Sequence, residues 1–330
     1  ENRNMAEYIR LLATGRVKIE PLVSARYPIE EVSSAYSALE GSDRPLLTLL
    51  QYPSPKSDGF VSDKRVNLKV TSPSKDDKLR IALIGAGGFA KSAHLPNMQK
   101  LSKDYTLRAV VNRTGPSAKS VGQNFGAEYV STSPQEVFAD PDVDAVIIAT
   151  RHHLHGSLVM QALEADKHVL VEKPLTINED ELQQIQNFYD DDSNSKPLLL
   201  TGFNRRFSPY AKRISKLLSM SHSPFVLNYR MNAGFIAQDN WVHGPEGGGR
   251  NLGEACHIYD LFTALSNSKV TEVSAHAIRS NIAHYQQNDN FVATLSFSNG
   301  SVANLVYTAL GNKNIPKETA ELYVDGKIAF

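Results

Sequence analysis

The strongest constraint on the fold is a short apolar run, residues 81–84, that leads directly into a glycine-rich turn, residues 85–90. The turn matches the pattern G-x-G-x-x-[G/A]. In this pattern the first glycine permits a tight turn, the second lets backbone amides approach a pyrophosphate, and the small last residue lets a helix pack on the strand. Glycine clusters also form ordinary turns, but a turn between a strand and a helix favours dinucleotide binding. We expect the turn to contact the cofactor through Gly85, Gly87, Gly88, Phe89 and Ala90.

Strands and helices alternate from residue 79 to about residue 205. Apolar segments predict strands at residues 79–84, 106–112, 144–149, 168–172 and 197–203. Such alternation is typical of a doubly wound parallel sheet with helices on both faces. We therefore predict an α/β dinucleotide-binding domain of the Rossmann type over residues 79–205.

After residue 205 the pattern changes to longer segments joined by hairpin signals. Residues 291–297 and 302–308 flank Asn299-Gly300, the strongest short-range hairpin signal. We predict an α+β domain over residues 206–330, with an open, mostly antiparallel sheet and one or two helices. Asp325-Gly326 favours a type I′ turn, and we expect the sheet to continue beyond its short return strand, so that this domain is truncated.

Residues 1–52 are predicted to form a small separate unit of two helices and a strand. Apolar residues at helical spacing predict a first helix that ends at Gly15. Pro28 is predicted to begin the second helix, and residues 46–52 are typical of a buried strand. Residues 53–78 are polar and rich in Ser, Asp, Lys and Pro, which indicates a linker or an excursion over the surface.

Composition excludes several classes of function. The chain has 330 residues with 35 basic and 35 acidic side chains, and this balance argues against a general nucleic-acid binder. No apolar stretch approaches the roughly 20 residues of a membrane span, and no segment resembles a signal peptide. The lone Cys256 excludes an internal disulfide and fits a reducing cytosol. We expect a cytoplasmic protein that binds neither nucleic acid nor a membrane.

The end of the second predicted strand bears on cofactor choice. A ribose 2′-hydroxyl is normally bound by an acidic residue at this point, but the sequence has Asn112, Arg113 and Thr114 instead. Arg113 and Thr114 suit a 2′-phosphate, through a charge-assisted fork and a hydroxyl hydrogen bond. The alternative is that Arg113 is a solvated loop residue. We favour NADP(H) over NAD(H), with these three residues near the ribose.

Two further segments border the same sheet edge. Lys173 follows the apolar strand before Pro174, at the carboxyl edge where open α/β sheets bind ligands. Burial there would lower its pKa and make it a usable acid or base, although a lysine at a strand end is usually just solvated.

A histidine-rich loop follows the strand that ends at Thr150, and we predict that it borders the nicotinamide. The alternative interpretation is an ordinary polar loop that caps a helix. The expected cofactor contacts here are Thr150, His152, His155 and Glu172.

The segment 247–261 carries a second candidate group. If it is helical, Glu254 and His257 share one face, and His257 also neighbours Asp260. A carboxylate beside an imidazole sets its tautomer and tunes it as a proton carrier, whereas such a histidine alone is more often a satisfied core residue. Cys256 beside His257 suggests zinc only weakly, because no second Cys/His cluster exists. We predict no metal.

Residues 80–330 resemble the glucose–fructose oxidoreductase, inositol dehydrogenase and MocA (Gfo/Idh/MocA) family. The matching segments are 85–90, 144–150, 167–174 (Lys-His-Val-Leu-Val-Glu-Lys-Pro), 202–207 (Gly-Phe-Asn-Arg-Arg-Phe) and 247–260. The resemblance implies a Rossmann domain paired with an open-sheet domain, activity on sugars or cyclitols with NAD(P), Lys173 as the catalytic lysine and His257 as the active-site histidine. Many members have Asp four residues before that histidine, where this sequence has Gly253. Glu254 is the next residue and is rotated about 100° from Gly253 around a helix. Whether it replaces the missing aspartate is therefore open.

Residues 1–52 resemble the C-terminal end of a medium-chain, zinc-type alcohol dehydrogenase. The resemblance is carried by residues 5–9 (Met-Ala-Glu-Tyr-Ile) and 27–31 (Tyr-Pro-Ile-Glu-Glu). Such a tail before a Gfo/Idh/MocA chain is similar to the bi-domain oxidoreductases of bacterial surface-sugar pathways. It contains neither zinc ligands nor a nucleotide turn, so we expect a packing or interface element.

These patterns lead to one principal hypothesis and one alternative. The principal hypothesis is an oxidoreductase that transfers a hydride between nicotinamide and a hydroxyl/ketone carbon of a sugar, nucleotide-sugar or cyclitol, with Lys173, His257 and Glu254 as catalytic residues. The alternative is a non-catalytic dinucleotide-binding sensor or scaffold. An exposed antiparallel sheet face is commonly buried between subunits, so we expect a homo-oligomer. The candidate substrate contacts, each with a structural alternative, are Asn204, Arg205, Asn232, Trp241 and Arg250.

Overall fold

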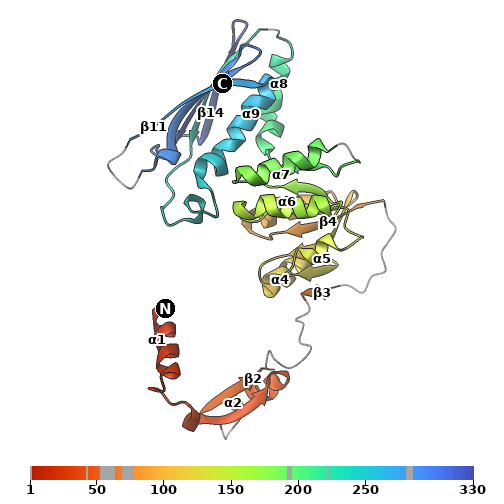
Figure 1. The fold of residues 1–330 in the computed structure, drawn as a ribbon, viewed down its shortest axis with the longest axis vertical. Helices are drawn as coiled ribbons and strands as arrows, with labels where there is room; N and C mark the ends of the chain where they lie inside the picture. The colour runs from red at the N-terminus through yellow and green to blue at the C-terminus, as the bar shows by residue number, and fades with distance from the viewer. Residues whose placement is uncertain are drawn as a thin grey trace. The chain divides into compact units, whose positions relative to one another are not determined.

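The computed structural model describes residues 2–41, 44–52, 64–68, 77–191, 195–221, 223–279 and 285–330. They form two compact units, divided between residues 63 and 64 (Figure 1). Within these ranges no helix is both long and apolar enough to cross a membrane.

The first unit contains two helices and a two-stranded parallel sheet. Its elements are α1 (Asn2–Ala13), the 3₁₀ turn η1 (Glu20–Leu22), β1 (Val23–Pro28), the 3₁₀ turn η2 (Ile29–Glu31), α2 (Val32–Glu40) and β2 (Leu47–Gln51). Both predicted helices are present, but Pro28 ends β1 instead of opening α2, because its backbone is extended (φ −56°, ψ 151°). The predicted buried strand is wrong in one respect: β2 is only half-buried, since a two-stranded sheet offers little cover.

The second unit begins with a seven-stranded sheet of order β3-β6-β5-β4-β7-β8-β9. Its strands are β3 (Arg65–Asn67), β4 (Leu79–Ile84), β5 (Tyr105–Val111), β6 (Tyr129–Ser131), β7 (Ala145–Ile148), β8 (His168–Val171) and β9 (Leu199–Thr201). All neighbours are parallel except β3, which is antiparallel to β6. The five strands expected from the sequence are confirmed. β3 lies within the segment predicted as a linker, of which residues 53–63 and 69–76 are outside the described residues.

Helices cover both faces of this sheet. They are α3 (Leu95–Lys100), α4 (Gly115–Phe125), α5 (Gln135–Phe138), α6 (His155–Glu164) and α7 (Glu179–Asp190). Because side chains alternate along β4, Ile81 and Leu83 enter one apolar core, whereas Ala82 and Ile84 enter the other. Residues 81–84 of this strand are therefore all apolar, and its carboxyl end leads into the glycine turn.

The rest of this unit is built on a six-stranded sheet of order β11-β12-β13-β10-β14-β15. Its strands are β10 (Val226–Asn232), β11 (Val270–Ala277), β12 (Asn290–Phe297), β13 (Val302–Thr308), β14 (Glu318–Val324) and β15 (Lys327–Ala329). All pairs are antiparallel except β10 with β13. The predicted fold class, a Rossmann domain with a mostly antiparallel second domain, is confirmed.

Both predicted hairpins are present in this sheet. Gly300 has φ +85° in the turn between β12 and β13. Asp325 and Gly326 have φ +48° and +67°, the two positive values that a type I′ turn requires. The turn chemistry in the sequence thus set the register of both strand pairs.

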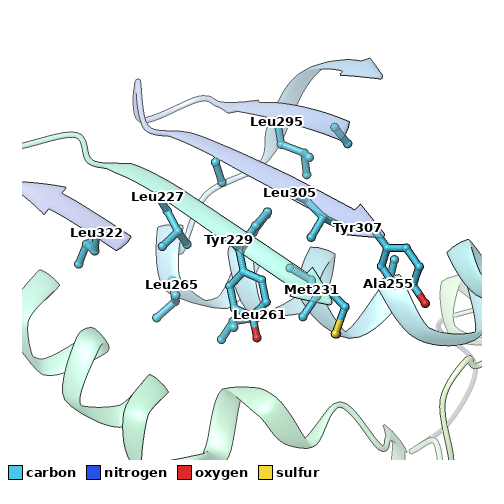
Figure 2. Close-up of a cluster of buried hydrophobic side chains, with 14 of the residues drawn as sticks. Leu227, Tyr229, Met231, Ala255, Leu261, Leu265, Leu295, Leu305, Tyr307 and Leu322 are labelled. Atoms are coloured by element: carbon cyan, nitrogen blue, oxygen red, sulfur yellow. The ribbon is translucent and has the colours of Figure 1, made fainter. Parts of the chain in front are cut away.

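Two helices, α8 (Pro209–Leu218) and α9 (Cys256–Ser266), close one face of this sheet. Figure 2 shows Leu227 and Met231 of β10 with Leu261 and Leu265 of α9 in the resulting core. α9 is apolar enough to be anchored there, so the residues at its N-terminal end are held firmly where the two sheets of the unit approach each other.

Candidate active site

A cavity of about 470 Å³ lies at the carboxyl edge of the parallel sheet, where residues of both sheet domains meet. It is lined by Phe89, Ala149, Thr150, His152, His155, Glu172, Lys173, Asn204, Arg205, Ile236, Trp241, Val242, Gly249, Arg250, Gly253, Glu254 and His257. Most of the predicted catalytic and substrate residues are in this set. Of the glycine turn, residues 85–90, Phe89 lines the cavity; the remaining turn residues and the segment 112–114 do not line it and follow the adjacent strands β4 and β5.

The glycine turn has the local geometry that close approach of a ligand requires. Gly85 has φ +95°, and a Cβ there would lie 2.6 Å from the carbonyl oxygen of Ala149, so only glycine fits. A Cβ at Gly87 or Gly88 would meet no atom within 4 Å, which leaves their backbone accessible. Ala90 is buried where the chain enters a short π-helix, η3 (Ala90–His94). The turn thus has an accessible backbone cradle of the kind that fits a pyrophosphate.

The predicted ribose contacts follow β5. The Asn112 side chain donates a 2.7 Å hydrogen bond to Ser117 Oγ and accepts one from the Arg113 amide. Arg113 and Thr114 are exposed, with Thr114 immediately before α4. Asn112 therefore orders the loop, while the Arg113 and Thr114 side chains face solvent beside the glycine turn.

Lys173 reaches across the cavity to the second domain. Its Nζ donates a 2.6 Å hydrogen bond to the carbonyl oxygen of Gly253. Burial lowers the pKa of Lys173, and nearby Arg205 acts in the same direction, against the opposing effect of Glu172 and Glu254. A lysine with a lowered pKa exchanges its proton closer to neutral pH, as a general acid or base requires.

His257 is the second buried titratable group. Burial, with Arg205 and Lys173 nearby, lowers its pKa to about 3, so the ring is neutral at pH 7. Its Nδ1 is buried and has no hydrogen-bond partner among the described residues. The expected pairing with Asp260 is wrong: the Arg206 guanidinium donates to Asp260 instead, at 2.9 Å from Nε.

Glu254 does not fit the proton-transfer role predicted from the sequence. Residues 251–255 form a π-helix, η7 (Asn251–Ala255), before α9, which changes the predicted register. The carboxylate accepts hydrogen bonds from Lys317 Nζ at 2.7 Å, Tyr307 Oη at 2.6 Å and Arg250 Nη2 at 2.9 Å. Burial raises its pKa, but these three donors outweigh burial and lower the pKa to about 2. Glu254 is therefore ionised at neutral pH and anchors Arg250.

This anchor predicts a specific pH dependence of stability. A carboxyl whose pKa falls on folding contributes stability above its unfolded pKa of 4.5, and loses it as the pH falls from there towards 2. Glu254→Gln is expected to lower the free energy of unfolding at pH 7 by on the order of 3 kcal/mol, with a smaller deficit at pH 3. Denaturant unfolding at both pH values measures the effect. An equal deficit at both would contradict it; the exposed Glu272→Gln is the control.

The other predicted substrate residues are held by ionic and aromatic contacts. Arg205 pairs with Glu318 through Nη2, at 2.6 Å, so it is not simply solvated. Arg250 is almost fully buried and also donates to the carbonyl oxygen of Gly234 at 2.6 Å. Trp241 begins the 3₁₀ turn η6 (Trp241–His243), and the Arg151 guanidinium carbon lies 5.1 Å from its ring centroid.

Asn204 and Asn232, predicted together, have different positions. Asn204 lines the cavity at the start of η5 (Asn204–Phe207). Asn232 does not line it; its buried amide donates to the carbonyl oxygen of Asn312 at 2.8 Å. The prediction of a substrate contact for Asn232 is therefore not supported, because its side chain holds the loop after β13.

The histidine-rich loop is ordered by backbone contacts. His155 is fully buried, and its ring nitrogens lie 2.7 Å from the Pro174 oxygen and 3.2 Å from the Thr150 oxygen. His152 Nδ1 lies 2.8 Å from the Gly247 oxygen. His155 thus positions the segments that carry Thr150 and Lys173, while His152 joins the two domains across the cavity.

Sequence reasoning missed partners that lie far away along the chain. His94 Nε2 lies 2.7 Å from Glu172 Oε1, and Tyr307 and Lys317 bind Glu254. None of the three stands in a recognisable motif, so only the fold brings them to the site. Among the described residues no group of three or more His, Cys, Asp or Glu side chains is arranged to hold a metal ion.

The fold and the cavity of the second unit define an NAD-binding Rossmann domain beside a domain with a mostly antiparallel sheet. The chain belongs to the Gfo/Idh/MocA oxidoreductase family. Residues 79–195 match the family's NAD-binding Rossmann fold, and residues 223–326 match the GFO/IDH/MocA C-terminal domain.

Named relatives and solved structures agree with this assignment. The chain is 28% identical over 229 residues to myo-inositol 2-dehydrogenase of Thermotoga maritima, covering 68% of this chain and 66% of that enzyme, slightly less than two thirds of its length. An NAD-binding protein from Listeria innocua is 28% identical, with a TM-score of 0.62 over 75% of this chain and 71% of that one. Myo-inositol dehydrogenase from Lactobacillus casei, solved with NAD(H) and myo-inositol, shares the fold at a TM-score of 0.63 and 17% identity, over 76% and 73% of the two chains.

Proposed function

We propose that the protein is an NAD(P)-dependent oxidoreductase that acts on a hydroxyl/ketone carbon of a sugar, nucleotide-sugar or cyclitol. The observation that carries the proposal is the position of Lys173, a lysine with a lowered pKa in a cavity at the carboxyl edge of the Rossmann sheet. Relatives named as inositol dehydrogenases support the substrate class. The accessible backbone at Gly87 and Gly88 supports dinucleotide binding, because the diphosphate requires a cradle free of side chains.

The chain's own residues have distinct roles in this proposal. A bound nicotinamide supplies or accepts the hydride. Lys173 Nζ moves the proton of the reacting hydroxyl, since burial brings its pKa below that of free lysine. His257 is neutral at pH 7 and orients that hydroxyl by a hydrogen bond. Trp241 offers an apolar face to a sugar ring, and Arg250 holds the loop that carries it.

A turnover assay tests this function. The protein is incubated with each reduced or oxidised dinucleotide and a panel of cyclitols, keto-sugars and nucleotide-sugars, while the absorbance of reduced nicotinamide is followed. Turnover of at least one member is expected. Tight dinucleotide binding without turnover across the panel would favour the alternative, a sensor or scaffold. One observation supports that alternative: among the described residues, no carboxylate is hydrogen-bonded to His257 Nδ1, as would be needed to orient a proton-carrying imidazole.

Cofactor choice gives a separate prediction. We propose that NADPH binds more tightly than NADH, because the exposed Arg113 and Thr114 follow β5 where an acidic residue would select a free ribose hydroxyl. Arg113→Ala is expected to reduce the NADPH preference by about tenfold, the effect of losing a charge-assisted contact. Isothermal titration with both dinucleotides measures it. Equal affinities in the unmutated protein would contradict the prediction, and Lys119→Ala, on the exposed side of α4, is the control.

We also propose roles for the parts outside the cavity. The first unit resembles an alcohol dehydrogenase C-terminal end and exposes apolar side chains on α1 and α2, including Met5 and Tyr36, which supports a packing or interface role. β11 is exposed along its whole length, and Val273 and Val292 are exposed on β11 and β12. These surfaces support a homo-oligomer.

A further inference from the structure

His152 belongs to the Rossmann domain by sequence but is held by the other domain. It begins η4 (His152–Leu154), four residues after the last residue of β7. Its Nδ1 lies 2.8 Å from the carbonyl oxygen of Gly247, and its ring centroid lies 5.0 Å from that of Trp241 in an edge-on arrangement. A Cβ at Gly253 would lie 2.9 Å from His152 Cε1. The imidazole therefore fills the space that a side chain at Gly253 would occupy.

These contacts determine the chemistry of the ring. A carbonyl oxygen can only accept, so the hydrogen is on Nδ1. Burial lowers the pKa of His152 to about 4, and the neighbouring Lys173, His155 and His153 act in the same direction. A neutral imidazole protonated on Nδ1 has a lone pair on Nε2. Among the described residues, the hydrogen bond of the His152 ring is made at Nδ1 and none is made at Nε2, and His152 lines the cavity.

Gly253 brings this acceptor close to the proposed catalytic lysine. Lys173 Nζ donates to the carbonyl oxygen of Gly253, and the His152 ring lies against the Cα side of the same residue. One end of the cavity thus presents an ammonium donor beside an imidazole acceptor. A vicinal diol, with two neighbouring hydroxyls, matches such a pair: one hydroxyl meets Lys173 and the next donates to His152.

We propose that His152 is a specificity-determining residue whose Nε2 accepts a hydrogen bond from the hydroxyl next to the reacting carbon, so that the enzyme selects vicinal diols and α-hydroxyketones. This inference rests on the proposed oxidoreductase function and deepens it. It also changes the residue's predicted role. The ring contacts Trp241, Gly247 and Gly253 of the second domain as well as His155 of its own domain, and we assign its free nitrogen to the substrate and not to the nicotinamide.

Trp241 provides a direct readout, because it is the chain's only tryptophan and lies against His152. A protonated imidazole quenches tryptophan fluorescence, whereas a neutral one does so weakly. In the unmutated protein we expect steady fluorescence from about pH 8 to 5 and quenching only towards the pKa of about 4. Circular dichroism confirms that the chain is folded at each pH. A quenching midpoint near 6.5 that disappears in His152→Asn would show a charged ring and overturn the proposal.

Substrate selection is tested with matched variants. His152→Asn keeps a side-chain amide that can donate to Gly247 but removes the Nε2 acceptor. His153→Asn is the control, because His153 also approaches a carbonyl oxygen, that of Glu246 at 3.4 Å, yet does not line the cavity. The probes are the best substrate of the panel and its monodeoxy analogues, or myo-inositol and its monodeoxy analogues if no turnover is seen. Binding is followed by Trp241 fluorescence in the presence of oxidised dinucleotide.

We expect the unmutated protein to bind the full polyol about five- to tenfold more tightly than the analogue lacking the neighbouring hydroxyl, as one neutral hydrogen bond allows. The ratio of these two affinities should fall close to one in His152→Asn and stay unchanged in His153→Asn. The proposal would be overturned by any of three results: the same affinity ratio in His152→Asn as in the unmutated protein, a loss of dinucleotide affinity alone, or no response of Trp241 fluorescence to the polyol.

The two proposals can fail separately. If the protein turns over a substrate but the affinity ratio is unchanged in His152→Asn, only the role of His152 is refuted. If the ratio depends on His152 but no substrate is turned over, only the catalytic function is refuted.

Discussion

Lys173→Met is expected to lower kcat by about 10²–10⁴, the usual contribution of a positioned general acid or base. The ammonium at Nζ lies in a cavity at the carboxyl edge of the sheet, and burial lowers its pKa. Methionine keeps the length and apolar stem of the side chain while it removes the exchangeable proton. Steady-state kinetics with the best substrate of the panel measures the loss, and dinucleotide titration should show nearly unchanged affinity.

Lys173→Arg separates proton transfer from simple charge. A guanidinium keeps the positive charge but does not deprotonate in proteins, so this variant is also expected to be nearly inactive. Substantial activity in Lys173→Arg would mean that the residue acts only through its charge. The exposed Lys216→Met on α8 is the control and should leave kcat unchanged.

The pH dependence of the oxidation direction gives an independent check of Lys173. As the base that accepts the hydroxyl proton, it must be neutral, and its lowered pKa makes the neutral form available below the ordinary value of 10.5. The rate of oxidation should therefore rise with pH along a limb whose midpoint lies below 10.5, and this limb should be absent in Lys173→Met. A limb that persists in the variant would assign the titration to another group.

Gly85→Ala is expected to cause the largest loss of both stability and dinucleotide binding. The residue has φ +95°, and a Cβ would lie 2.6 Å and 2.7 Å from the carbonyl oxygen and carbon of Ala149. Because these are backbone atoms of the strand-to-loop junction after β7, the clash cannot be relieved by a side-chain rotation. Backbone strain alone costs about 1–3 kcal/mol, and displacing the junction adds to it. Thermal unfolding and dinucleotide titration measure the two effects.

Gly87→Ala is the matched control for this prediction. A Cβ at Gly87 would meet no atom within 4 Å, and its φ is not in the left-handed region. We expect Gly87→Ala to unfold at nearly the same temperature as the unmutated protein, yet to bind dinucleotide more weakly, since its new methyl group occupies the cradle. Equal thermal stability of Gly85→Ala and Gly87→Ala would show that the turn tolerates a side chain at Gly85.

Local patterns predicted the framework of the site. The glycine turn and the strand before Lys173 are contiguous in sequence, and each reports a backbone requirement that neighbouring residues satisfy. The short strands β3 and β6, of three residues each, were missed, because so few residues show no periodicity. β3 is held by its pairing with β6, together with Arg65, whose guanidinium lies 3.7 Å from the Tyr129 ring centroid.

Side-chain roles that depend on distant partners were predicted less well. Glu254 and Asn232 were selected for their chemistry, but Lys317 and Tyr307 bind the Glu254 carboxylate, and the Asn232 amide nitrogen donates to the loop carbonyl of Asn312. These partners lie between 53 and 80 residues away along the chain. No local pattern could reveal that these polar groups were already bound.

The sequence by itself determined the fold class, the position of the glycine turn and the place of Lys173, because turn geometry and strand alternation are set by neighbouring residues. The tertiary structure decided which polar side chains remain available to a ligand. His152 and Gly253 illustrate the difference: they are far apart in sequence, and only the packing of one domain against the other puts an imidazole in the space that the glycine leaves. Hydrogen-bond partners and burial depend on such long-range contacts, so ionisation and ligand specificity are properties of the folded chain.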